Sequence, residues 1–200
     1  MIITHKKNTA NPNSYRVYSA QMKFSESKMD ECLRMLNTYY TKKNIDGVIE
    51  SQLGTDIDIH EGVDAIVTTT DGIKHLWQIR NREEYEYSGE LACKLYKRDG
   101  TKDELHYTTA THYLTVFWFR DTPTHISIVN MQALKQRVLS NLPYYTDKAI
   151  SSNSKFYAMK PKEYVDIAYL IWDNTDVIAK LEREYRLKLY NTYRENKDGK

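Results

Sequence analysis

The feature of this sequence that most constrains its fold is a nearly continuous apolar segment, Tyr113 to Phe119. Side chains of a strand alternate between the two faces of a sheet, so a strand without polar alternation must be covered on both faces. The segment is rich in aromatic and β-branched residues, which favour strands. We therefore predict the central strand of a layered α/β domain, followed by a strand at 126–129 and a helix at 131–139.

A β-hairpin is predicted upstream of that strand. Residues 63–67 form a short run rich in β-branched residues, and residues 73–80 are predicted to form the returning strand. Thr70-Asp71-Gly72 lies between them, and Asp-Gly suits the backbone conformation that a tight hairpin requires. The two predicted strands differ in polarity, since the second carries Gln78 and Arg80.

Helical spacing precedes the hairpin. Ser27 and Asp30 have the spacing of a capping box, and apolar residues recur at helical intervals over 29–40. A second helical segment is predicted over 43–53, with Glu50 near its end. These two segments would place a helix directly before the hairpin.

We divide the chain into three parts. Residues 1–24 are predicted to form an N-terminal arm or edge strand, and residues 25–145 the α/β core. Residues 146–200 are predicted to form a helical extension, because Pro161 can open a helix and apolar residues repeat at intervals of three and four over 178–193.

Composition excludes several classes of protein. Hydrophobic residues make up 40% and charged residues 28% of the 200 residues, which excludes a disordered chain. No segment approaches the about 18 apolar residues that a membrane-spanning helix needs, and the first residues lack the apolar part of a signal peptide. Cys32 and Cys93 are expected to be free thiols. We therefore expect a soluble cytoplasmic protein.

Charge is distributed unevenly along the chain. The net charge of +2 is too small to indicate a nucleic-acid partner by itself. Between Lys43 and Lys74, however, there is no Lys or Arg, and the acidic residues there are Asp46, Glu50, Asp56, Asp58, Glu61, Asp64 and Asp71. These carboxylates either form a solvated face, or some of them converge on a divalent cation that offsets their repulsion.

The predicted hairpin brings polar side chains together. Gln78 and Arg80 share one face of their strand, Trp77 and Ile79 the other, and the turn brings Asp64 alongside the polar pair. Burying such groups without partners is unfavourable by several kcal/mol, so they need a partner, a metal ion or a wet cleft. Two simpler interpretations remain: Asp64 caps the turn, or the polar pair faces solvent.

This arrangement resembles the PD-(D/E)XK nucleases. In that family a helix with an acidic residue leads into a hairpin whose first strand starts with Asp, often as Gly-x-Asp. The second strand carries Glu or Gln, one apolar residue and Lys, and a helix-strand segment closes the core. This sequence has Gly62-Val63-Asp64, Gln78-Ile79-Arg80 and the apolar strand 113–119 in that order. The correspondence covers about residues 43 to 140 and implies a restriction-endonuclease-like core.

The resemblance implies a role for each matching residue. Asp64 would be the principal ligand of Mg²⁺ or Mn²⁺, Gln78 a second ligand through its carbonyl oxygen, and Glu50 a third, borne by the helix. Asp56 and Asp58 are alternatives to Glu50, although we interpret them as surface carboxylates. Hard oxygen ligands suit these metals.

Arg80 departs from the family pattern, because it stands where the family has Lys. A guanidinium stays charged near neutral pH and cannot act as a base. It can still bind a phosphate with two hydrogen bonds and stabilise developing charge. Arg80 therefore either accompanies water activated by a metal ion, or marks a site that has lost catalysis.

The expected function is a metal-dependent endonuclease that hydrolyses DNA phosphodiester bonds. Arg82, Lys94, Lys97 and Arg98 are the expected contacts to the DNA backbone. A homodimer is also expected, since double-strand cleavage normally needs two active sites. The alternative is a catalytically inactive protein of this fold that binds nucleic acid or a host protein, for example as an anti-defence inhibitor. The small size and the 17 tyrosines resemble bacteriophage proteins.

Overall fold

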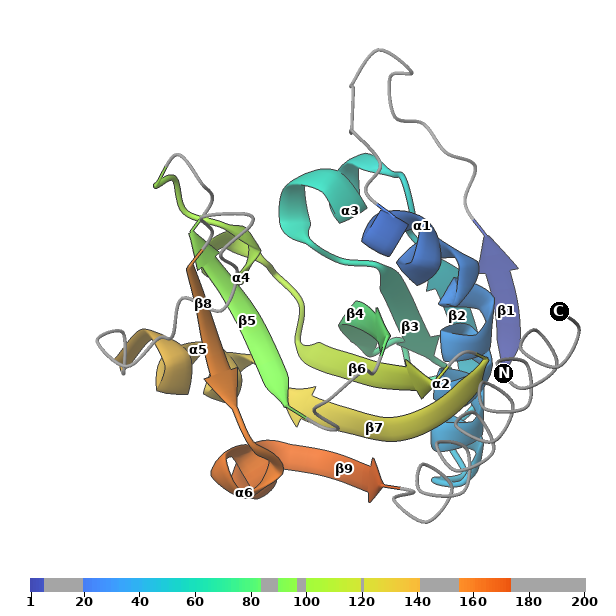
Figure 1. Ribbon diagram of the computed structural model, residues 1–200. Coiled ribbons are helices and arrows are strands. Elements are labelled where there is room, and N and C mark those ends of the chain that lie inside the picture. Colours follow the sequence, from blue (N-terminus) through green and yellow to red (C-terminus); the bar gives the residue numbers. More distant parts are fainter. Residues whose placement is uncertain (6–19, 84–89, 97–99, 120, 141–154, 174–200) are drawn as a thin grey trace, which may run out of the picture.

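A seven-stranded mixed sheet organises the chain in the computed structural model, which describes residues 1–5, 20–83, 90–96, 100–119, 121–140 and 155–173 (Figure 1). In spatial order its strands are β1 (Ile2–His5), β2 (Gly47–Ser51), β3 (Ala65–Thr69), β4 (Lys74–Glu83), β6 (His112–Phe119), β7 (Thr122–Asn130) and β9 (Ala168–Asp173). The pairs β1–β2 and β4–β6 are parallel, and the other neighbours are antiparallel.

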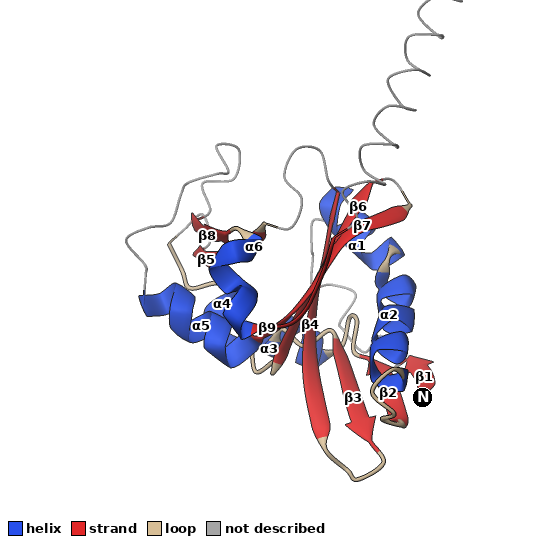
Figure 2. Ribbon diagram, turned by 90° about the horizontal axis from the view of Figure 1, so that it is seen from below, coloured by secondary structure: helices blue, strands red, loops and turns tan. Residues whose placement is uncertain are grey.

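The two faces of the sheet are covered by different layers (Figure 2). Helices α1 (Ala20–Ser27) and α2 (Met29–Thr41) lie on one face. The other face carries α3 (Asp56–Glu61), α4 (Glu104–Tyr107), α5 (Met131–Ser140), α6 (Pro161–Tyr164), the 3₁₀ turn Val165–Ile167, and a ribbon of β5 (Leu91–Tyr96) and β8 (Lys155–Met159). The protein is therefore a three-layer α/β structure, as the apolar strand predicted.

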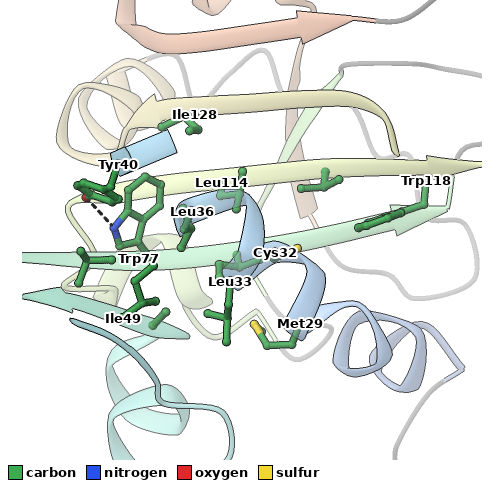
Figure 3. Close-up of a cluster of buried hydrophobic side chains, with 14 residues drawn as sticks. Met29, Cys32, Leu33, Leu36, Tyr40, Ile49, Trp77, Leu114, Trp118 and Ile128 are labelled. Carbon is green, nitrogen blue, oxygen red and sulfur yellow. Dashed lines mark hydrogen bonds between the residues drawn. The ribbon is translucent and has the colours of Figure 1, made fainter. Parts of the chain in front are cut away.

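Helix α2 confirms the predicted helical periodicity. Its buried residues Cys32, Leu33 and Leu36 pack with Trp77 and Leu114 of the sheet (Figure 3). The predicted capping box is wrong, because Ser27 ends α1 and its hydroxyl donates to the carbonyl oxygen of Phe24 at 2.7 Å. The helix begins after Lys28, whose side chain makes no capping hydrogen bond.

The predicted central strand and hairpin are confirmed. Six of the eight residues of β6 are buried, and the strand lies between β4 and β7. Strands β3 and β4 pair with Ala65 opposite Trp77, and the turn between them has Gly72 at φ 83°. Strand β7 and helix α5 also follow in the predicted order.

Two helix predictions are wrong. Within the predicted helical segment 43–53, residues Gly47–Ser51 form strand β2 instead, which pairs with both β1 and β3. Asn44 reverses the chain at φ 57° after α2, and β-branched residues such as Val48 and Ile49 then alternate between exposed and buried positions. Glu50 is therefore borne by a strand and not by a helix.

The predicted C-terminal helical extension is also wrong where the structure describes it. Pro161 opens only the single turn α6, and Ala168–Asp173 form β9, which pairs with β7. Residues 155–173 thus add strands to both sheets. The predicted helix at 178–193 lies outside the described residues. At the other end, Ile2–His5 form an edge strand, as one of the two alternatives for residues 1–24 predicted.

Candidate functional site

Asp64 lies where the pairing between β3 and β4 ends. Its backbone N–H donates to the carbonyl oxygen of Trp77 at 2.8 Å, and its carbonyl oxygen accepts from the N–H of Gln52 at 2.8 Å. One carboxyl oxygen accepts from the backbone N–H of Ile79 at 2.5 Å. The Asp64 carboxylate therefore accepts the hydrogen bond from β4 that a backbone carbonyl oxygen would accept if the strand pairing continued. Asp64 is only 5% exposed.

A second carboxyl group, that of Asp58, meets Asp64. Thr55 caps helix α3, where its hydroxyl accepts from the N–H of Asp58, and one carboxyl oxygen of Asp58 accepts from the N–H of Gly54 at 2.7 Å. Gly62, in the left-handed conformation at φ 61°, ends this short helix and returns the chain to β3. The Asp58 side chain is then in hydrogen-bonding contact with that of Asp64.

The contact between two acids changes how Asp64 titrates. Burial is the main reason why the pKa of the Asp64 carboxyl rises from its usual 3.8 to about 7; the positive charge of Arg80 opposes the shift, and Asp58 contributes to it. Two carboxyl groups in contact resist simultaneous ionisation, so a substantial fraction of Asp64 is protonated near neutral pH. The arrangement suits either a shared proton or a bound cation.

Gln78 and Arg80 leave β4 on the face opposite α2. Trp77 and Ile79 belong to the core beneath α2, so alternation directs Gln78 and Arg80 to the other face, as predicted. Gln78 is 3% exposed. The charge of Arg80 acts on the carboxyl of Asp64. The structure therefore brings the three predicted residues of the hairpin together on one side of the sheet.

Arg80 is held by a carboxylate that the sequence analysis did not consider. Its guanidinium forms an ion pair with Glu104, the first residue of α4, and also donates to the carbonyl oxygen of Ile79 at 3.3 Å. The Arg80 side chain is 31% exposed and the Glu104 side chain 22%. Sequence offers little signal for this pair, because Glu104 is distant from Arg80 along the chain, with strand β5 between them.

Glu50 of strand β2 and Gln52, just after the strand, add a pair of polar residues to this region. Gln52, opposite Asp64, donates from its side-chain amide to Glu50 at 2.5 Å. Gln52 is fully buried, and its side-chain carbonyl oxygen has no hydrogen-bond partner among the described residues. Glu50, on strand β2, is therefore linked to the surroundings of Asp64 by its hydrogen bond with Gln52.

The donor set fits a hard divalent cation only in part. The carboxylates of Asp58 and Asp64 and the orphaned carbonyl oxygen of Gln52 are oxygen donors of the kind that Mg²⁺ and Mn²⁺ prefer. No group of three or more His, Cys, Asp or Glu side chains within the described ranges is placed to hold a metal ion. A metal ion here would depend on two carboxylates supplemented by amide oxygens.

Two of the predicted DNA contacts are engaged within the protein. Arg82 donates to the carbonyl oxygen of Ala92 at 2.7 Å, and the exposed Lys94 forms an ion pair with Asp103 at 2.9 Å. Lys97 and Arg98 lie outside the described residues.

Asp58 is the residue whose setting the sequence analysis misjudged. It was interpreted as a surface carboxylate, yet it is 9% exposed and contacts Asp64. The available signal was its position three residues after Thr55, which is the spacing of a helix cap and turns the side chain back toward the start of the helix.

Comparisons with protein families, curated proteins and solved structures found no match to this chain. Within the part of the chain that the structure describes, no helix is long and apolar enough to cross a membrane.

Proposed function

We propose that this protein is a metal-dependent endonuclease of the PD-(D/E)XK type that hydrolyses DNA phosphodiester bonds. The observation that carries the proposal is the contact between the buried Asp58 and Asp64 carboxyls, with the guanidinium of Arg80 beside them. An apolar sheet face has little structural use for two acids in contact, because their mutual desolvation is unfavourable. A buried carboxyl with a strongly raised pKa, such as that of Asp64, is characteristic of functional sites.

The arrangement of the elements supports a restriction-endonuclease-like core. Helix α2 precedes the hairpin, Asp64 stands at the start of its first strand, and Gln78 and Arg80 lie on its second strand. Strand β5, helix α4 and strand β6 then follow, and β6 pairs with β4 in parallel. Strand β2 and helix α3, between α2 and the hairpin, are the main differences from the predicted order.

The metal ligands in this proposal are Asp64 and Asp58, with amide oxygens from Gln78 or Gln52. Asp58 takes the accessory role for which Glu50 was first considered. When bound, Mg²⁺ or Mn²⁺ supplies charge stabilisation to a phosphodiester and activates water for its hydrolysis. The hydrogen bond from the N–H of Ile79 orients Asp64 for this role, and a bound cation would favour the ionised form of Asp64.

The experiment is a nicking assay on supercoiled plasmid with Mn²⁺ or Mg²⁺ and with chelator. We expect nicking by the wild-type protein only in the presence of the divalent ion, and no nicking by Asp64→Asn. Glu31→Gln is the matched control, because it removes a carboxylate from an ion pair with Arg34 on α2, on the opposite face of the sheet. Nicking by Asp64→Asn at the wild-type rate would refute the proposed site.

A second candidate function is binding without cleavage, and the Arg80–Glu104 ion pair favours it. Arg80 replaces the family Lys and is already neutralised by a carboxylate, so the site lacks the residue that could exchange a proton. This alternative predicts a stable complex with DNA or with a host protein, and no nicking under any metal condition. Arg80→Lys separates the two functions, since only a nuclease gains rate from it.

A further inference from the structure

Glu104 lies between Arg80 and a glycine at the edge of the candidate site. The ion pair joins it to Arg80 on one side. On the other side, a Cβ atom added to Gly62 would lie 3.1 Å from Cγ and 3.2 Å from Oε1 of Glu104. The missing side chain at Gly62 therefore makes the room that the Glu104 carboxylate occupies.

The backbone around Glu104 is fixed by hydrogen bonds from both ends of α4. Asp103 caps the helix by accepting from the N–H of Glu104 at 2.8 Å, and Asp103 is itself paired with Lys94. At the other end, the hydroxyl of Thr108 donates to the carbonyl oxygen of Gly62 at 3.2 Å. Helix α4 is thus anchored against the turn that precedes Asp64, and its first side chain is held beside Arg80.

A guanidinium presents one flat array of donors, which a carboxylate and a phosphodiester use in the same way. Because Glu104 already occupies part of the Arg80 guanidinium, a DNA phosphate competes with its carboxylate for those donors. Both side chains are partly exposed, so this exchange does not require the core to open.

We propose that the Glu104 carboxylate competes with DNA for the guanidinium of Arg80, and that a phosphodiester of the DNA backbone displaces Glu104 on binding. This inference rests on the proposed function, because it takes Arg80 as a phosphate contact. It adds a residue that sets how tightly the site binds a nucleic-acid backbone, and it assigns α4 the role of holding that residue in place.

The test is the affinity for a short labelled DNA duplex, measured by fluorescence anisotropy with Ca²⁺ as the only divalent ion. Glu104→Gln keeps the shape of the side chain and removes the competing charge. From the size of a partly exposed ion pair we expect it to bind DNA about two- to fivefold more tightly than wild type. In the absence of Arg80 the gain should vanish, so the Arg80→Gln/Glu104→Gln double variant should bind DNA no more tightly than Arg80→Gln alone. Glu31→Gln should bind DNA as tightly as wild type.

Thermal unfolding of each variant shows whether it folds. If Glu104→Gln does not fold, Glu104→Asp serves as a second variant. Asp keeps the charge but shortens the reach to Arg80, so a smaller gain is expected. The inference is overturned if Glu104→Gln binds no tighter than wild type, if the gain persists without Arg80, or if no variant binds DNA. A gain without any nicking in the plasmid assay would support the inference while rejecting nuclease activity.

Discussion

Replacing Asp64 with Asn removes a buried acid while keeping the shape of the side chain. The amide oxygen of Asn can accept from the N–H of Ile79, as the carboxyl oxygen does now at 2.5 Å. Its amide nitrogen can donate to the carboxylate of Asp58, with which the Asp64 side chain is in hydrogen-bonding contact. The variant therefore keeps both contacts and loses only the ionisation.

The expected gain in stability follows from the pKa of Asp64. In the unfolded chain the acid ionises near 3.8, whereas burial raises its pKa to about 7 in the folded protein. Between these values the native state holds a proton that the unfolded state has lost, so the free energy of unfolding falls as the pH rises from about 4 to 7. The difference corresponds to at most about 4 kcal/mol, lost in full above pH 7.

The assay is urea unfolding of the wild-type protein and of Asp64→Asn between pH 4 and pH 9. The two should have similar stability near pH 4, and the variant should become the more stable as the pH rises. Comparing the two proteins cancels the contributions of other titrating groups. Adding Mn²⁺ at pH 8 should stabilise the wild-type protein alone, by about 3 kcal/mol at a hundredfold excess over its dissociation constant.

A variant that is less stable than wild type at pH 8 would refute this account, because it would mean that the Asp64 carboxylate is stabilising in its ionised form. A difference that does not change with pH would show that Asp64 does not share a proton with Asp58. Stabilisation of both proteins by Mn²⁺ would place the metal site elsewhere.

Two further predictions concern the surroundings of the site and the start of strand β6. Gly62→Ala should lower the free energy of unfolding by more than Gly72→Ala, which is expected to lower it by about 1 kcal/mol. Both glycines have positive φ, but only at Gly62 would the added Cβ atom contact Glu104. Urea unfolding of both variants measures the difference. Burial lowers the pKa of His112, stacked on Trp77 at 4.5 Å, to about 4, so its neutral form contributes stability that is lost as the pH falls from 6.5 toward 4. An NMR titration in which this imidazole protonates near pH 6.5 would contradict the second prediction.

Local periodicity was sufficient to predict the parts of the fold whose residues form their own pattern. The helical spacing from Met29 to Tyr40, the apolar run of β6 and the Asp-Gly turn of the hairpin all appear in the structure. Alternation along β4 also separated Gln78 and Arg80 from Trp77 and Ile79 correctly. Each of these features depends on neighbours only a few residues apart.

The tertiary structure alone decided which segments became strands and which charges met. Residues 47–51 and 168–173 have apolar patterns that suit a helix or a strand, and each became a strand because a distant strand offered its hydrogen bonds. The contact of Asp58 with Asp64, and that of Arg80 with Glu104, likewise depends on how α3 and α4 pack on the sheet. Desolvation and charge pairing act through space, so the spacing of residues along a chain does not determine them.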